Sequence, residues 1–188
     1  MRKIGIYGGT FDPIHNGHLI LARDACEALD FEKMIFVPAA ASPHKMERSA
    51  AAAEIRLEMV RTGIEGESRF EVDDCEVRRT APSYTIDTIE IIQRRHSDAQ
   101  IFCCIGEDNL AGLTSWHRFD ELKRLVRFVV LDRRGFENKS DYPVIRRHID
   151  ISATEIRKRV ADGRSIRYLV PRAVEEIIGR EQLYRKPK

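Results

Sequence analysis

The sequence lacks the features of several protein classes. It has no apolar run of the about 18 residues that a membrane span needs. Residues 3–7 already read as a strand of the fold, so we expect no signal peptide and a cytoplasmic location. The charges nearly balance, because 32 Lys and Arg against 30 Asp and Glu leave a net charge of +2. We therefore expect neither a membrane nor a nucleic-acid partner.

The sequence also has few cysteines and no spacing that would pair them. Its four cysteines form no C-x-x-C motif and no zinc-ligand pattern, and two of them are adjacent within an apolar strand pattern. We expect reduced thiols that act as small core residues, and no protein metal site. These cysteines are Cys26, Cys75, Cys103 and Cys104.

The periodicity of apolar residues predicts alternating strands and helices. With 188 residues, of which 43% are hydrophobic, the chain is expected to form one domain over 1–188. Strands are predicted at 3–7, 34–37, within 70–77, at 101–105, 128–131 and 144–149. Helices are predicted at 18–29, 50–62, 83–95, 116–126, from 152 or 154 to about 161, and at 171–179. This alternation favours an open, mostly parallel sheet that binds ligands beyond the carboxyl ends of its strands.

The first predicted strand leads into the helix through a glycine-rich loop. Residues 5–18 read G-I-Y-G-G-T-F-D-P-I-H-N-G-H. Such a junction offers free backbone N–H groups and the positive end of a helix dipole, and Gly8 and Gly9 let an anion approach the main chain. The loop has neither the Walker A ending nor the G-x-G-x-x-G pattern. We therefore predict a phosphate site of another kind.

Two histidines, His15 and His18, lie at this junction. A single histidine there would more often cap or pack the helix, but two around a glycine favour a function. A donating imidazole can follow charge as it develops on a polyphosphate. A metal site ranks lower, because no neighbouring carboxylate or cysteine completes it.

A second set of polar residues follows the last predicted strand, in I-S-A-T-E-I-R at 151–157. Ser152 and Thr154 place hydroxyl and N–H groups at a helix start, and Arg157 lies one turn further on. Ser152 and Glu155 also match a capping box. Capping and anion binding can coexist here.

These motifs resemble those of a known enzyme group. G-G-T-F-D-P-x-H-x-G-H is similar to the signature of the HxGH nucleotidylyltransferase superfamily, and 151–157 resembles its I-S-S/T-T-x-I-R motif, with Ala153 where a hydroxyl is frequent. Segments 43–45, 83–88, 106–110 and 116–117 resemble those of the nicotinate-mononucleotide adenylyltransferases. The resemblance covers residues 5–157.

The resemblance implies a Rossmann-like, doubly wound α/β fold with a small helical C-terminal part, and the synthesis of nicotinate adenine dinucleotide from ATP and nicotinate mononucleotide with Mg²⁺. It implies catalytic roles for His15, His18, Lys45 and Arg157. It implies ATP binding by Gly8, Gly9, Thr10, Phe11, His15, His18, Gly106, Asp108, Ser152, Thr154 and Arg157. It implies substrate binding by Thr10, Lys45, Tyr84, Thr85 and Trp116.

The implied reaction needs no general base, because the attacking 5′-phosphate is already ionised at neutral pH. We expect a direct in-line displacement at the α-phosphorus of ATP, with the catalytic residues neutralising charge.

Several alternatives stay open. Trp116 could be a core anchor, Lys45 a solvated loop residue and Asp108 part of a turn. The chain could be a pantetheine-phosphate adenylyltransferase, could prefer the amide nucleotide, or could be a non-catalytic nucleotide-binding protein. The sequence leaves the oligomeric state open, a homo-oligomer included.

Overall fold

The computed structural model of the protein describes residues 1–40, 51–79, 83–133, 135 and 140–186. Six strands form one sheet in the order β3-β2-β1-β4-β5-β6, and every neighbouring pair is parallel. The strands are β1 (Arg2–Gly9), β2 (Lys33–Pro38), β3 (Phe70–Val72), β4 (Ala99–Gly106), β5 (Arg127–Asp132) and β6 (Val144–Arg146). The doubly wound, Rossmann-like α/β fold is therefore confirmed.

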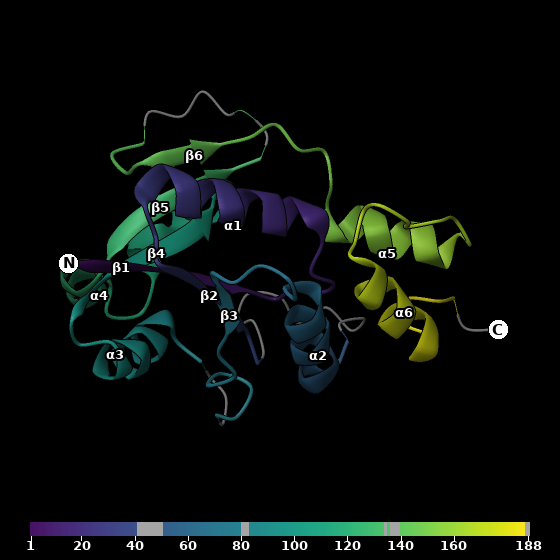
Figure 1. Cartoon of the computed structure of the whole chain (residues 1–188), viewed down its shortest axis with the longest axis horizontal. Helices are drawn as coiled ribbons and strands as arrows, with labels where there is room; N and C mark the ends of the chain where they lie inside the picture. Colours follow the sequence, from purple (N-terminus) through teal and green to yellow (C-terminus); the bar gives the residue numbers. More distant parts are fainter. Residues whose placement is uncertain (41–50, 80–82, 134, 136–139, 187–188) are drawn as a thin grey trace.

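Helices cover both faces of the sheet, as Figure 1 shows for α1 and α3. The α-helices are α1 (Asn16–Leu29), α2 (Ala53–Gly63), α3 (Thr85–Arg95), α4 (Phe119–Leu125), α5 (Ala153–Ala161) and α6 (Arg172–Arg180). One apolar cluster joins α1, α2 and α6 to one face, and a second cluster joins α3 and α4 to the other. The C-terminal helices α5 and α6 lie beyond the carboxyl ends of the strands (Figure 1).

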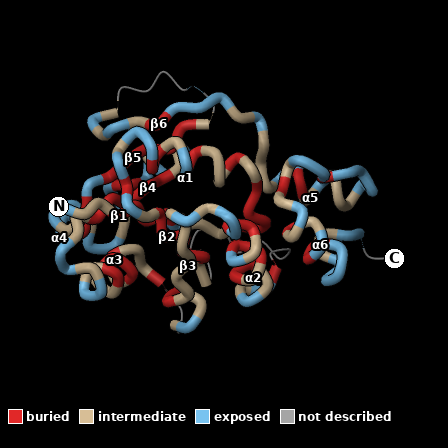
Figure 2. The backbone as a smooth tube through the Cα atoms, viewed as in Figure 1, coloured by how far each residue is buried: buried red, intermediate tan, exposed pale blue. Residues whose placement is uncertain are grey.

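The central strands β1 and β4 have long buried stretches (Figure 2). Residues 4–7 and 101–105 are all buried, as expected for strands covered on both faces. Side chains alternate between the two clusters, with Ile4 and Ile6 toward α3 and Tyr7 toward α1. The four cysteines are free and buried, as predicted.

The helix predicted over 116–126 is wrong at its start. Residues Glu107–Ser115 form a 3-10 helix, η1, and α4 begins only at Phe119. Arg118 has a φ of 53°, which an α-helix cannot accommodate, so a helix cannot run through it. Leu113 is the only buried residue of η1, so this segment shows no apolar period in the sequence.

Other elements begin or end a few residues away from their predicted boundaries. The last strand stops at Arg146 rather than 149, and α2 starts at Ala53 rather than 50. Most of the segment between the strand predicted at 34–37 and the helix predicted at 50–62 lies outside the described residues. Within the described ranges, every helix is too short or too polar to cross a bilayer.

Candidate functional site

A cavity of about 1020 Å³ opens at the carboxyl ends of β1 and β4, where the strand order reverses. Open α/β sheets bind ligands at such a point. All the predicted site residues that the structure describes line this one cavity. They are Gly8, Gly9, Thr10, Phe11, His15, His18, Tyr84, Thr85, Gly106, Asp108, Trp116, Ser152, Thr154 and Arg157. Lys45, with the rest of the 43–45 motif, lies outside the described residues.

The loop after β1 is fixed by a buried aromatic side chain. Phe11 is 3% exposed and has a φ of 48°, in the left-handed region. Its ring packs edge-on against Tyr7 and His18, with centroid distances of 5.5 and 5.2 Å. The buried ring therefore anchors a backbone conformation that would otherwise be uncommon.

His15 and His18 lie against each other at the start of α1. Their rings stack with centroids 3.7 Å apart. The backbone N–H of His15 donates to Nδ1 of His18 at 3.2 Å. Because Nδ1 accepts this bond, the proton of a neutral His18 is on Nε2, which is a donor.

Both ring nitrogens of His15 are buried, and neither has a hydrogen-bond partner within the described part of the chain. Burial, together with a smaller effect of the nearby Arg133, lowers the pKa of His15 to about 3. Burial also lowers the pKa of His18 well below 6.5, with smaller contributions from His15 and Arg133. Both rings are therefore neutral at pH 7 in the ligand-free cavity. A bound polyanion would favour their charged forms.

Gly17 allows His15 to occupy this position. A Cβ atom at Gly17 would lie 3.0 Å from Nδ1 of His15, closer than carbon and nitrogen normally approach. The glycine of the H-x-G-H motif therefore leaves room for the first histidine.

Helix α5 faces the same loop. Ser152 Oγ accepts a hydrogen bond from the Glu155 N–H at 3.2 Å, so the predicted N-cap is confirmed. Arg157 Nη1 donates to the carbonyl of Asp12 at 2.8 Å. Asp12 also receives bonds on Oδ1, from the Ala51 N–H at 3.1 Å and the Tyr184 hydroxyl at 2.6 Å. Asp12 thus joins the first loop to α5, to the start of the α2 region and to the C-terminal segment.

The start of α3 forms another wall of the cavity. Its N-cap, Tyr84, provides no side-chain hydrogen bond to the helix, so the cap leaves the first N–H groups without a side-chain acceptor of its own. Ser83 Oγ is buried and has no partner among the described residues. The ring of Tyr84 stacks on His117 at 4.2 Å. Trp116 lines the cavity and also packs edge-on against Phe128 at 6.5 Å, so it serves in part as the anchor that a lone tryptophan suggests.

The carboxyl end of β4 contributes acidic side chains. The side chain of Asp108 folds back over Gly106. A Cβ atom at Gly106 would lie only 2.7 Å from Asp108 Oδ1, so the glycine leaves room for this carboxylate. In the described ranges, no three His, Cys, Asp or Glu side chains gather as ligands for a metal ion.

The cavity also contains residues that were not predicted as site residues. Arg133 follows β5, donates from Nη1 to the Ile151 carbonyl at 2.9 Å, and lines the cavity. Its place directly after a buried strand was the available signal. Glu76 and Thr88 line the wall near α3 and share a 2.7 Å hydrogen bond. Burial raises the pKa of Glu76. Thr88 ends the 83–88 motif but was not among its predicted site residues, whereas Glu76 belongs to no motif.

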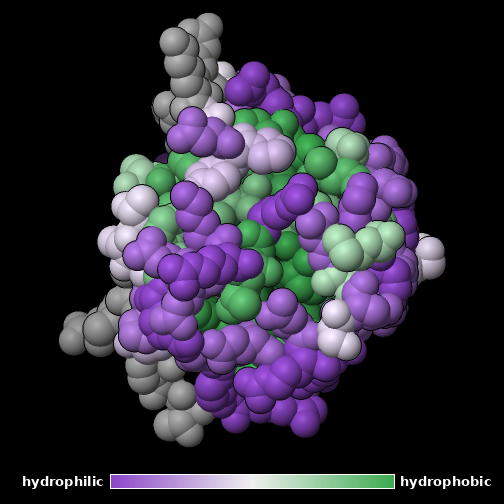
Figure 3. All heavy atoms as spheres, turned by 90° about the vertical axis from the view of Figure 1, so that its left-hand side faces the viewer, coloured by the Kyte–Doolittle hydropathy of each residue, from purple (hydrophilic) through white to green (hydrophobic). Residues whose placement is uncertain are grey.

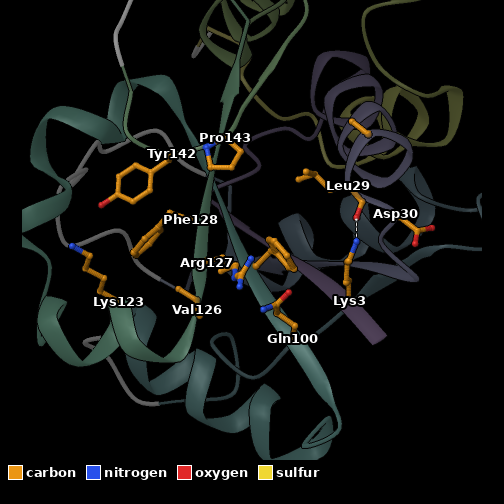
Figure 4. A pocket seen from close by; sticks show the side chains of 12 residues that line it. Lys3, Leu29, Asp30, Gln100, Lys123, Val126, Arg127, Phe128, Tyr142 and Pro143 are labelled. Atoms are coloured by element: carbon orange, nitrogen blue, oxygen red, sulfur yellow. Dashed lines mark hydrogen bonds between the residues drawn. The ribbon is translucent and has the colours of Figure 1, made fainter. Parts of the chain in front are cut away.

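A second hollow, of about 580 Å³, lies at the opposite end of the sheet, near the starts of β1, β4 and β5. On this side of the molecule, hydrophobic residues are surrounded by hydrophilic ones (Figure 3). Gln100 and Arg127 border the hollow on the sheet, with Phe128 and Tyr142 on one side of it and Lys3 and Leu29 on the other (Figure 4). It contains none of the predicted site residues that the structure describes, so the candidate active site is the cavity at the carboxyl ends.

Known proteins resemble the chain over almost its entire length. The model of the cytidylyltransferase-like family matches residues 6–159. A protein of Geobacillus thermodenitrificans, named as a probable nicotinate-nucleotide adenylyltransferase, is 43% identical over 187 residues, which are 98% of this chain and 87% of the relative. A protein of the same name from Bacillus pumilus is 37% identical over 98% of this chain and 99% of its own.

A solved structure agrees with this fold. The nicotinic acid mononucleotide adenylyltransferase of Plasmodium falciparum, complexed with NaAD, superimposes with a TM-score of 0.80 over 98% of both chains. The two sequences are 21% identical, so this likeness concerns the fold alone.

Proposed function

Because the chain belongs to the nicotinate-nucleotide adenylyltransferases of the cytidylyltransferase-like family, we propose that it transfers the adenylyl group of ATP to nicotinate mononucleotide. The products are nicotinate adenine dinucleotide and pyrophosphate. One observation carries the proposal: two polar ends, the His15–His18 loop with α5 and the start of α3, open into the same cavity. Such a cavity can hold two anionic substrates together.

The first end suits the polyphosphate of ATP. The Nε2–H of His18 is a donor there, and Arg157 is a fixed cation held by the Asp12 carbonyl. His15 brings two buried nitrogens without partners in the described residues, and such atoms are costly unless a ligand satisfies them. The main chain of Thr10 and Phe11 and the hydroxyls of Ser152 and Thr154 complete the proposed ATP contacts.

The second end suits the carboxylate of the nicotinate ring. The uncapped N–H groups at the start of α3 and the unpartnered Ser83 hydroxyl offer donors to an anion. Tyr84 and Thr85 provide the proposed main-chain contacts, and Trp116 the aromatic surface for the ring. A site that pairs its donors with a carboxylate should reject the amide strongly.

Transfer then proceeds in one step. A 5′-phosphate oxygen of nicotinate mononucleotide forms a bond to the α-phosphorus of ATP, while the bond to the bridging oxygen breaks and pyrophosphate leaves. The attacking phosphate is ionised at neutral pH, so the protein supplies positioning and charge rather than a base. His15, His18, Arg157 and Lys45 are the proposed charge-neutralising side chains.

We expect Mg²⁺ to accompany ATP. Mg²⁺ is commonly bound by substrate phosphates and water with one or two carboxylates, which fits a cavity whose described residues offer no cluster of three ligands. Asp108, which lines the cavity, is the carboxylate proposed to contact it, or alternatively to contact a ribose hydroxyl. When bound, Mg²⁺ would neutralise phosphate charge.

The proposal is tested by supplying ATP with nicotinate mononucleotide, nicotinamide mononucleotide or phosphopantetheine and measuring pyrophosphate release. We expect rapid release with the acid nucleotide and at least 100-fold lower kcat/KM with the amide. Preference for phosphopantetheine would instead support the pantetheine-phosphate adenylyltransferase alternative. ATP binding without pyrophosphate release in the presence of any of the three acceptors would support a non-catalytic protein.

A homo-oligomeric state and a cytoplasmic location stay predictions.

A further inference from the structure

Helix α2 carries one charged side chain that is buried. Arg56 is 3% exposed, whereas Glu54 and Arg61 of the same helix are exposed. Among the described residues Arg56 makes no ion pair with a carboxylate; burial lowers its pKa, although Asp12 is near enough to oppose that effect. A buried guanidinium is costly unless hydrogen bonds satisfy its donors.

Three main-chain carbonyls supply those hydrogen bonds. Arg56 donates from Nη1 to Thr10 at 2.6 Å, from Nη2 to Ala40 at 3.0 Å, and from Nε to Ala51 at 3.0 Å. The guanidinium group is planar and its donors have fixed directions, so each carbonyl is placed relative to the other two. Two of them flank residues 41–50, and the third belongs to the loop after β1.

The bond to Thr10 sets the direction of the next N–H group. In a trans peptide the C=O of one residue and the N–H of the next point in opposite directions. With the Thr10 carbonyl turned toward Arg56, the Phe11 N–H points away from it. This N–H has no hydrogen-bond partner in the part of the chain that the structure describes, and Phe11 lines the cavity.

The other end of the Phe11–Asp12 segment is held as well. The Asp12 carbonyl accepts from Arg157 at 2.8 Å, and Phe11 keeps its φ of 48° through its buried ring. A side chain of α2 and a side chain of α5 therefore hold the Thr10–Phe11 and Asp12–Pro13 peptide groups, which flank the Phe11–Asp12 peptide. Preorganised N–H donors of this kind lose little freedom when an anion binds.

We propose that Arg56 is a positioning residue, which holds the Thr10–Phe11 peptide so that the Phe11 N–H is presented to the ATP polyphosphate. Arg56 does not touch the substrate; it acts through the carbonyl of Thr10. This inference rests on the proposed function only in naming ATP, because any polyphosphate that binds the loop would use the same N–H group.

The test compares Arg56→Lys and Arg56→Met with wild type, using Arg61→Met as the control. Arg61 lies on the same helix but is exposed and bonds to Asp74. Inorganic tripolyphosphate binding, measured by calorimetry, should weaken at least tenfold in both Arg56 variants, with Lys less affected than Met, and stay unchanged in Arg61→Met. The KM for ATP should rise by a similar factor, while the KM for the acceptor stays within twofold.

A merely structural role gives a different result. Partial misfolding would lower the concentration of active sites and hence kcat, but would leave tripolyphosphate affinity and both KM values near those of wild type. That result would overturn the proposal. Tripolyphosphate binding needs no acceptor and no turnover, so the comparison stays valid even if the proposed reaction is wrong.

A measurement on wild type covers the case in which the variants do not fold. With ¹⁵N-labelled phenylalanine, the backbone amide resonance of Phe11 should shift on addition of tripolyphosphate, more than that of Phe31 in the core. An unchanged Phe11 resonance at saturating tripolyphosphate would refute the positioning role.

Discussion

At the scale of single residues, the two histidines of the first motif have different environments although they stack on each other. His18 has its proton placed by the His15 N–H, whereas the ring of His15 is buried without partners among the described residues. The sequence predicted that both serve the site. It could not predict their tautomers or the depression of their pKa values, because these depend on burial and on Arg133, which is distant in sequence.

Replacing His18 with Ala removes a donor directed at developing charge. We expect kcat/KM to fall by the equivalent of about 2 to 4 kcal/mol, roughly 30- to 1000-fold, because preorganised donors contribute this much elsewhere. Steady-state kinetics measures the effect. His148→Ala, an exposed residue outside the cavity, is the control. A kcat/KM near that of wild type would remove His18 from the mechanism.

The depressed pKa of His15 makes the stability of the ligand-free protein depend on pH. The folded state holds this ring neutral down to pH about 3, whereas the unfolded chain takes up a proton near pH 6.5. The free energy of unfolding therefore falls as the pH drops from about 6.5 toward 3. Between pH 7.5 and pH 5, His15 should account for about 2 kcal/mol of this loss.

Urea unfolding of wild type and His15→Asn at these two pH values tests the prediction. The pH-dependent loss should be about 2 kcal/mol smaller in His15→Asn, and His148→Asn should behave as wild type. Equal losses in wild type and His15→Asn would show that His15 titrates normally in the folded protein.

Arg56 and Tyr184 both contact the loop after β1, and neither contact was predicted from the sequence. Both act on the first loop through contacts with residues far away in the chain: Arg56 bonds to the Thr10 carbonyl, and Tyr184 to the Asp12 carboxylate. An arginine in a helix or a tyrosine near a chain end has no sequence signature for such a contact. Only the packing of α2 and of the C-terminal segment brings them there.

At the scale of elements, the periodic helices and the buried strands could be predicted because their patterns are local. The 3-10 helix η1 and the late start of α4 could not, since they depend on the left-handed backbone of Arg118 and on a single buried leucine. The start of α5 was predictable, because Ser152 and Glu155 carry the capping pattern and the Ser152 Oγ accepts the Glu155 N–H.

Variants of Ser152 and Thr154 can distinguish helix capping from anion binding at the start of α5. Ser152→Ala should lower the free energy of unfolding by about 1 kcal/mol, because it removes the N-cap, and should also raise the KM for ATP. Thr154→Ala should raise the KM for ATP while changing stability by less than about 0.5 kcal/mol, since Thr154 is exposed and is not the cap. Urea unfolding and ATP titrations of both variants decide this. If Ser152→Ala affects stability alone, its hydroxyl has no ATP contact.

At the scale of the whole molecule, the sheet order brings together motifs that are far apart in sequence. The ends of β1 and β4 are neighbours because β1 and β4 pair directly, and α5 closes the same edge from the C-terminal part (Figure 1). The alternation of strands and helices predicted a parallel sheet. The strand order itself was not predicted: local periodicity does not determine which strands are neighbours, and the resemblance implied only a Rossmann-like, doubly wound sheet.

We propose that this single cavity holds both anions in line, so that the adenylyl group moves directly from ATP to the acceptor phosphate. The stereochemical course at phosphorus tests this claim, with an ATP that is chiral at its α-phosphorus. A single displacement predicts inversion of configuration at that phosphorus in the dinucleotide product. Retention of configuration, which requires two displacements and an adenylylated protein group such as His15 or His18, would contradict the claim.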